Sequence, residues 1–138
     1  MPDMAEERPL GREVLVVEDE AIGAMLIEEV LGKAGYGIIG PVASLENALA
    51  VAEVTAMDAA LLDINLRGKL SFPVAYVLRG RGVPFIFLSG YAHEIVIPPD
   101  LRDVVLLAKP YNLTRILTVL SRLIAQRGGP VPPRSPLA

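Results

Sequence analysis

The chain has 138 residues, of which 52% are hydrophobic and 21% charged, and this length fits one compact domain with no room for a second full one. Thirteen basic against sixteen acidic side chains give a formal net charge of -3, which argues against a general binding surface for nucleic acid. The lack of cysteine excludes disulfides, thiolate nucleophiles and cysteine-based zinc sites, and a single histidine disfavours a histidine-rich metal site. The functional groups left as candidates are carboxylates, hydroxyls and amines.

Neither a secretory signal nor a membrane span is expected. Residues 1–12 are polar and acidic and lack the apolar core of a signal peptide. Every apolar run is interrupted by glycine, proline or a charged residue before it reaches the roughly 18 residues that a membrane span needs. We therefore expect a cytoplasmic protein without a membrane partner, whose apolar residues form a buried core.

The first two predicted elements are a strand and a helix. Residues 14–17 form a continuous aliphatic run that stops at acidic residues, as a strand buried on both faces would. From 21 to 33 the apolar residues recur at helical spacing, and Gly35 supplies a stop. The apolar face of this amphipathic helix is predicted to consist of Ile22, Met25, Leu26, Val30 and Leu31.

The same alternation continues along the chain. The pattern predicts a strand at 36–42, a helix from a Ser44 cap to 53, and a strand at 59–62 that ends at Asp63. After a break at Gly68, it predicts a short helix at 73–79 and strands at 84–88 and 104–108. A last helix is predicted from an Asn112 cap to about 126. Residues 91–103 read as a loop, because Pro98 and Pro99 forbid a long helix there.

Alternating helices and nearly uniformly apolar strands predict an α/β fold, a doubly wound five-stranded parallel sheet with about five helices on both faces. We expect a polar extension at 1–12, one domain at 13–127 and a proline-rich disordered tail at 128–138. The short tail leaves no attached effector, so output is expected through protein contacts.

Polar side chains follow four of the predicted strands. They are Glu18 and Asp19 after the first strand, Asp63 after the third, Ser89 after the fourth and Lys109 after the fifth. In a doubly wound sheet, functional groups collect beyond the carboxyl ends of the strands, so these side chains should converge at one edge. Taken one at a time, each also has a purely structural interpretation, such as a helix N-terminal charge or a turn hydroxyl.

The acidic members of this set favour a cation. Carboxylates a few ångströms apart repel one another by about 4 kcal/mol per pair at an effective dielectric near 20. Oxygen ligands select Mg²⁺, with Asp19 and Asp63 as direct ligands, Glu18 as a ligand through water and the backbone carbonyl of Asn65 as a further one.

With that charge neutralised, a carboxylate can attack a phosphoryl donor and form an aspartyl phosphate. We assign this nucleophile to Asp63. Lys109 would then act as a point charge on the phosphoryl oxygens, and the Ser89 hydroxyl would donate a hydrogen bond to one of them.

These segments resemble the receiver domain of two-component response regulators, over residues 13–126. The resemblance rests on four pieces in the same order: VLVVEDE at 14–20, LLDINL at 61–66 followed by Gly68, Ser89-Gly90 and Lys109-Pro110. It implies a flavodoxin-like strand order 2-1-3-4-5, Asp63 as phosphoacceptor, Glu18 and Asp19 as the acidic metal pair, Ser89 as the switch hydroxyl, Lys109 as the phosphate-binding amine and a cis Lys109-Pro110 peptide.

Two features distinguish this chain within that resemblance. Many receivers carry an aromatic switch residue three positions before the lysine, where this chain has Leu106. The segment PFIFLSGY at 84–91 resembles the Pro-Phe-x-Phe-Ala-Thr-Gly-Tyr signature of a mostly single-domain alphaproteobacterial subgroup, with Leu88 and Ser89 in place of Ala and Thr. Tyr91 is a candidate to carry part of the signal that the missing aromatic ring would carry.

The leading hypothesis is therefore a single-domain receiver. It would be phosphorylated on Asp63 by a sensor histidine kinase or phosphotransfer protein, would signal to an unidentified downstream protein, and could form a phosphorylation-dependent dimer. It would catalyse only its own phosphorylation and dephosphorylation, without acting as a classical enzyme.

Three alternatives stay open at this stage. An aspartate-nucleophile phosphatase needs a general acid two residues after the nucleophile, where this chain has Asn65, which cannot transfer a proton. A nucleotide-binding flavodoxin-like protein needs a phosphate-cradling loop after the first strand, where this chain has acids. A pseudo-receiver that binds partners without being phosphorylated is disfavoured by the complete acid, hydroxyl and amine set and mildly favoured by Leu106.

Overall fold

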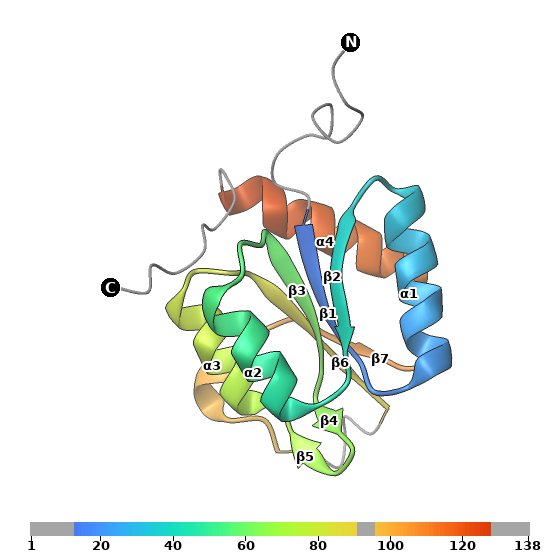
Figure 1. Cartoon of the computed structure of the whole chain (residues 1–138). Coiled ribbons are helices and arrows are strands. Elements are labelled where there is room, and N and C mark those ends of the chain that lie inside the picture. Colours follow the sequence, from blue (N-terminus) through green and yellow to red (C-terminus); the bar gives the residue numbers. More distant parts are fainter. Residues whose placement is uncertain (1–12, 91–95, 128–138) are drawn as a thin grey trace.

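A computed structural model of the chain describes residues 13–90 and 96–127, which form a three-layer α/β sandwich (Figure 1). Its strands are β1 (Glu13–Val17), β2 (Gly37–Val42), β3 (Ala59–Asp63), β4 (Asn65–Leu66), β5 (Lys69–Leu70), β6 (Phe85–Ser89) and β7 (Leu106–Ala108). Its α-helices are α1 (Ala21–Lys33), α2 (Leu45–Val54), α3 (Phe72–Gly80) and α4 (Leu113–Arg127), and a 3-10 helix spans Pro99–Leu101. Within these ranges no helix is both long and apolar enough to cross a membrane.

The main sheet confirms the predicted fold class and strand order. Its order is β2-β1-β3-β6-β7, with every pairing parallel, so the five strands stand in the order 2-1-3-4-5. All five residues of β3 and of β6 are buried, because helices cover both faces of the sheet. The parallel arrangement brings the carboxyl ends of the strands to one edge.

Side chains alternate along the strands between two hydrophobic cores. One core lies between the sheet and α2 and α3, and includes Leu15, Leu62 and Phe87. The other lies between the sheet and α1 and α4, and includes Val16, Leu61 and Ile86. Figure 1 shows the two pairs of helices on opposite faces. A strand that is buried on both sides reads as a continuous apolar run, which explains why the sequence pattern located these strands.

The predicted core face of α1 is confirmed at Leu31 and is wrong at three other positions. The buried residues of this helix are Gly23, Ala24, Ile27 and Leu31. Ile22, Met25 and Leu26 are instead exposed, with relative accessibilities of 72%, 67% and 45%. The first turn of α1 presents small residues to the interior because the site described below occupies the space there, so its larger apolar residues face outward.

Other elements also differ from the sequence prediction. Residues 65–70 form a two-stranded hairpin, β4–β5, whose central residues Arg67 and Gly68 both have the positive φ that a tight type I′ turn requires. Strand β7 begins at Leu106 rather than at 104. In place of about five helices, the described residues contain four α-helices and the short 3-10 helix, which agrees with the loop predicted around Pro98 and Pro99.

Helix starts follow the predicted caps. The Ser44 hydroxyl accepts a hydrogen bond from the Asn47 N–H at 3.2 Å, and the Asn112 side chain accepts one from the Arg115 N–H at 3.0 Å. The peptide between Lys109 and Pro110 is cis, as the resemblance implies. The predicted extension at 1–12 and tail at 128–138, together with Tyr91, lie outside the described residues.

Candidate functional site

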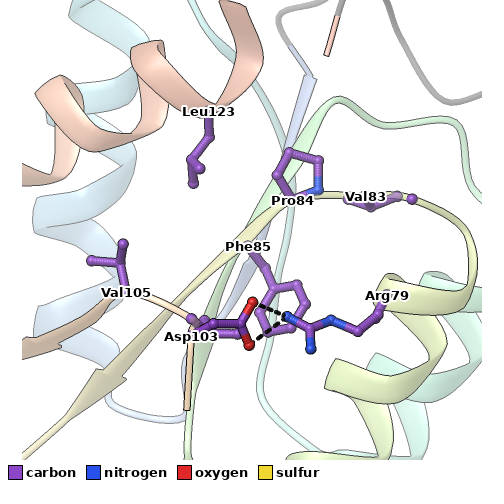
Figure 2. Close-up of a pocket in the computed structure, with 9 residues that line it drawn as sticks. Arg79, Val83, Pro84, Phe85, Asp103, Val105 and Leu123 are labelled. Carbon is purple, nitrogen blue, oxygen red and sulfur yellow. Dashed lines mark hydrogen bonds and ion pairs between the residues drawn. The ribbon is translucent and has the colours of Figure 1, made fainter. Parts of the chain in front are cut away.

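Two cavities lie at opposite ends of the parallel strands. The smaller, about 260 Å³, is bounded by the residues that lead into β6 and β7 and by Leu123 of α4 (Figure 2). Its charged groups, Arg79 and Asp103, are bonded to each other, with 3.0 Å between Arg79 Nη2 and Asp103 Oδ2. The two charged side chains of this cavity therefore neutralise each other, and the other residues that line it are mainly apolar.

The larger cavity, about 790 Å³, lies at the carboxyl ends of the strands. Its walls come from the segments that follow β1, β3, β6 and β7, and include Asp19, Asp63, Ser89 and Lys109. The parallel topology explains this convergence, since it places the carboxyl ends of four strands side by side. Four of the five residues that the sequence analysis selected at strand ends thus line one pocket.

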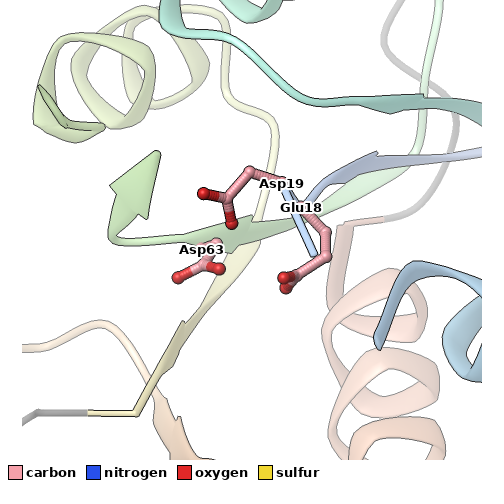
Figure 3. Close-up of side chains that lie close together, drawn as sticks. All are labelled: Glu18, Asp19 and Asp63. Atoms are coloured by element: carbon pink, nitrogen blue, oxygen red, sulfur yellow. The ribbon is translucent and has the colours of Figure 1, made fainter. Parts of the chain in front are cut away.

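Three carboxylates cluster at this pocket: Asp19 and Asp63 line it, and the buried Glu18 lies beside them (Figure 3). Glu18, Asp19 and Asp63 each offer an oxygen, and these three atoms lie within 4.8 Å of one another. Glu18 and Asp63 are buried, whereas Asp19 is half-buried. Burial removes much of the screening that water would provide, so the mutual repulsion of these groups is larger than on an open surface.

Lys109 supplies the positive charge that faces the cluster. Its Nζ lies 3.0 Å from Asp63 Oδ2 and 3.3 Å from Glu18 Oε1. The Lys109 amide N–H also donates to the Ser89 carbonyl at 2.8 Å, which fixes the backbone beside β6. One ammonium group therefore bridges the two buried carboxylates, although it follows them by 91 and 46 positions in the chain.

Burial dominates the titration of the nucleophile candidate. Desolvation raises the pKa of Asp63 from 3.8 to about 7, and the charge of Glu18 adds to the rise, while the hydrogen bond from Lys109 opposes it. Burial by itself would lower the pKa of Lys109, but the hydrogen bond and charge of Asp63 and the charge of Glu18 outweigh it and raise that pKa. Lys109 therefore stays charged over the range in which Asp63 titrates.

Backbone contacts hold the loops that carry the carboxylates. Asp19 Oδ2 accepts a hydrogen bond from the Arg67 N–H at 2.9 Å, which joins the β1 end to the hairpin. The buried Ser71 hydroxyl donates to the Asp63 carbonyl at 2.6 Å. Asn65 donates its N–H to Asp63 Oδ1 at 3.4 Å, and its side chain accepts from the Gly68 N–H at 2.7 Å. The β4–β5 hairpin thus anchors both aspartates.

The donor set fits a hard divalent cation. Three carboxylate oxygens within 4.8 Å of one another carry more negative charge than the one ammonium group of Lys109 balances. Mg²⁺ takes oxygen ligands and is commonly held by one or two carboxylates with water and a phosphoryl oxygen. The half-buried Asp19 and the buried Asp63, which both line the open cavity, are the groups best placed to hold it.

Solved structures and curated proteins similar to this chain identify its family. No family model matches the chain. The solution structure of SdrG from Sphingomonas melonis Fr1 is 36% identical, with 81% of this chain and 95% of SdrG covered and a TM-score of 0.71. The chain belongs to the receiver-domain family of response regulators. A BeF3-activated conformation of SdrG is also similar to this receiver, at 34% identity over 83% of this chain and 98% of the other, with a TM-score of 0.68.

Two further relatives support the same family. The receiver domain of the sensor histidine kinase PA1611 from Pseudomonas aeruginosa PAO1 is 29% identical over 83% of this chain and 98% of that chain, with a TM-score of 0.68; that structure has a magnesium ion coordinated in its active-site cleft. The regulator PhyR from Methylorubrum extorquens is 26% identical over 118 residues. This receiver spans between 44% and 62% of the length of the curated relatives it matches.

Every residue predicted for the site lies in or beside the receiver's acidic pocket. Glu18, Asp19 and Asp63 form the carboxylate cluster, and Lys109 contacts two of them. Asn65 and the buried Ser89 line the same cavity. Leu106, at the position of the usual aromatic switch, is half-buried and packs against the core beneath α2 and α3. The single histidine, His93, lies outside the described residues.

Sequence reasoning missed two side chains of this receiver site. Tyr111 donates its phenolic hydrogen to Glu18 Oε2, and its ring lies 5.5 Å from Lys109 Nζ. Burial and the adjacent Glu18 raise the pKa of this phenol. Ser71, which holds the Asp63 carbonyl, was also absent from the predicted set. The signal available for Tyr111 was a polar-tipped aromatic residue two positions after the strand-end lysine.

The raised pKa of Asp63 predicts a stability effect in the metal-free protein. Because the folded state holds its proton up to about pH 7 while the unfolded carboxyl loses it near 3.8, the free energy of unfolding falls as pH rises through this window. Asp63→Asn removes the titrating carboxyl group, so the free energy of unfolding no longer falls for this reason as the pH rises. Lys109 keeps Glu18 as a partner in the variant. We expect the variant to be more stable than wild type by about 1–2 kcal/mol above neutral pH, with the difference vanishing near pH 4.

Urea unfolding in the presence of a chelator measures this difference. Asp103→Asn is the matched control, because its carboxylate is exposed and lies at the other end of the sheet. The control should change the free energy of unfolding by less than about 1 kcal/mol. An Asp63→Asn variant less stable than wild type at neutral pH would contradict the assigned electrostatics.

Proposed function

We propose that this receiver accepts a phosphoryl group on Asp63, in a Mg²⁺-dependent reaction, from a sensor histidine kinase or a phosphotransfer protein. One observation carries the proposal: Asp63 is buried at a strand end within a three-carboxylate cluster, with an ammonium group 3.0 Å from its Oδ2. A nucleophile, its charge partner and a cation-binding oxygen set are the groups that phosphoryl transfer to a carboxylate requires.

In the proposed step, an oxygen of the Asp63 carboxylate forms a bond to phosphorus while the bond from phosphorus to the donor's imidazole nitrogen breaks. The electron pair of that bond returns to the imidazole. The Lys109 ammonium group, which pairs with Asp63 Oδ2 in the unmodified protein, then pairs with a phosphoryl oxygen, and the Ser89 hydroxyl donates a hydrogen bond to another phosphoryl oxygen. A Mg²⁺ ion would be held by Asp19 and Asp63, with the Asn65 carbonyl as a further ligand and Glu18 acting through water, and it would neutralise the negative charge of the site.

Relatives of this chain lend support to the chemistry. The PA1611 receiver domain carries magnesium in its active-site cleft, and SdrG has a BeF3-activated conformation. We extend both properties to this chain because its own pocket presents the oxygen donors and the lysine that such ligands need. A phosphatase acting on external esters is disfavoured, since Asn65 cannot donate a proton to a leaving group.

The exposed side chains of α1 suggest where the phosphodonor docks. Ile22, Met25 and Leu26 lie on the helix that starts directly after the acidic pocket, and each is exposed. Apolar groups gathered beside a reactive carboxylate suit the apolar face of a partner that must bring a histidine to Asp63. The proposal places the donor, and with it this receiver, in the cytoplasm, with output through contacts to a downstream protein.

Incubation with acetyl phosphate tests the phosphoacceptor directly. Wild type with Mg²⁺ should shift on a phosphate-affinity gel, and both a chelator and Asp63→Asn should abolish the shift, because they remove the cation and the nucleophile respectively. Asp103→Asn should shift like wild type. Labelling retained by Asp63→Asn would move the nucleophile elsewhere, and a folded wild type that never labels would favour a non-phosphorylated binding module.

A charged residue introduced on α1 should weaken donor docking without changing the phosphorylation chemistry. Met25→Asp puts a carboxylate on the proposed docking face, so transfer from a phosphorylated histidine phosphotransfer domain should slow by about tenfold. Labelling by acetyl phosphate should not change, because the acidic pocket is untouched. Val54→Asp is the control, since Val54 is an exposed apolar residue at the end of α2 on the opposite face of the sheet. Equal transfer rates for the two variants would remove α1 from the donor interface.

A further inference from the structure

Tyr111 is a polar aromatic residue beside the acidic pocket that the proposed chemistry does not use. It lies in the connection between β7 and α4, and its hydroxyl donates a hydrogen bond to Glu18 Oε2. Its ring lies over Lys109, with 5.5 Å between the ring centroid and Nζ. The residue thus contacts both a carboxylate of the cluster and the ammonium group that balances it.

Hydrogen bonds satisfy both oxygens of the Glu18 carboxylate. Oε1 accepts from Lys109 Nζ at 3.3 Å and from the Glu20 N–H at 3.1 Å, while Oε2 accepts from Tyr111. The Glu18 side chain is fully buried, so each of these bonds replaces one that water would otherwise make. A cation that approached Glu18 directly would compete with these three donors for the acceptor sites of its carboxylate.

Asp19 is placed differently. Its Oδ2 accepts from the Arg67 N–H at 2.9 Å, and the half-buried side chain lines the open cavity beside Asp63. Removing a donor from a buried carboxylate costs more than rearranging a half-buried one that water reaches. The contacts therefore rank Glu18 as the carboxylate least available for direct coordination and Asp19 as more available.

The first turn of α1 is shaped to hold the Tyr111 ring. A methyl group added at Gly23 would lie 3.3 Å from Tyr111 Cε2 and 3.6 Å from Glu18 Cδ. Any larger residue would push the ring or the carboxylate aside. The small residue at this position, which breaks the expected apolar face of α1, therefore permits the contact between Tyr111 and Glu18.

We propose that Tyr111 is a positioning residue for the metal site: its phenol holds the Glu18 carboxylate away from the cation and leaves Asp19 and Asp63 as the direct carboxylate ligands. This inference rests on the proposed function, since it assigns a cause to the outer position of Glu18 in that site. The hydroxyl of Tyr111 lowers the affinity of the pocket for the divalent ion, because it competes with the ion for the Glu18 carboxylate.

Tyr111→Phe tests this role with little change in shape. The phenyl ring keeps its packing against Gly23 and Lys109, but Glu18 Oε2 loses its donor and is left buried with an unmet acceptor. A cation can then satisfy that oxygen, so calorimetric titration with MgCl₂ should give a dissociation constant about tenfold lower than that of wild type. Tyr76→Phe is the matched control, because the Tyr76 hydroxyl donates to Asp100, away from this pocket.

A second measurement follows Glu18 itself. In the ¹³C spectrum of the side-chain carboxyl groups, MgCl₂ should shift Asp19 and Asp63 more than Glu18 in wild type, and should shift all three in Tyr111→Phe. If Tyr111 only supported the fold, Tyr111→Phe would leave the relative ¹³C shifts of the three carboxyl groups unchanged. Circular dichroism establishes that each variant is folded before titration.

The outcomes separate this inference from the proposed function. If wild type and Tyr111→Phe bind Mg²⁺ with equal affinity, or the variant binds more weakly, the inference is wrong while the metal site stands. If no protein in the series takes up Mg²⁺, the metal-dependent function fails as well. A gain in affinity in Tyr76→Phe equal to that in Tyr111→Phe would also overturn the inference.

Discussion

The bridge from Lys109 to Glu18 and Asp63 is the contact on which the rest of the structure depends. Two buried carboxylates whose oxygens lie within 4.8 Å of each other would repel by roughly 3–4 kcal/mol at an effective dielectric near 20, and a third acid lies close by. A single ammonium group, 3.0 Å from one carboxylate and 3.3 Å from the other, makes this burial tolerable. The remaining negative charge gives the pocket its preference for a divalent cation, and the shared lysine is the charge that an incoming phosphoryl group can take over.

Much of this arrangement could be predicted from the sequence because parallel strands have a simple signature. Strands buried on both faces read as unbroken apolar runs, and four of the five runs end at a polar residue, so Asp63 and Lys109 could be placed at one sheet edge. The caps at Ser44 and Asn112 were equally local signals. The hairpin β4–β5 was not predictable in this way, since strands of two residues carry no periodicity.

The core face of α1 shows where local patterns stop being informative. Periodicity selects bulky apolar residues such as Met25, but the interior beside α1 is already filled by Glu18 and by the ring of Tyr111. This packing depends on the contact between Glu18 and Tyr111, which lie 93 positions apart in the chain. A periodicity analysis of a short stretch of sequence cannot detect such a contact. The first turn of the helix therefore buries the small residues Gly23 and Ala24, and the bulky side chains left outside become available to a partner.

The most direct test of this account is a crystal structure of the chain with magnesium and beryllium trifluoride, a mimic of the phosphoryl group. The account predicts beryllium bonded to an oxygen of Asp63, a magnesium ion in contact with Asp19 and Asp63, and Lys109 Nζ moved from the Asp63 carboxylate to a fluoride. Beryllium attached to another residue, or a lysine still paired with an unmodified Asp63, would contradict it.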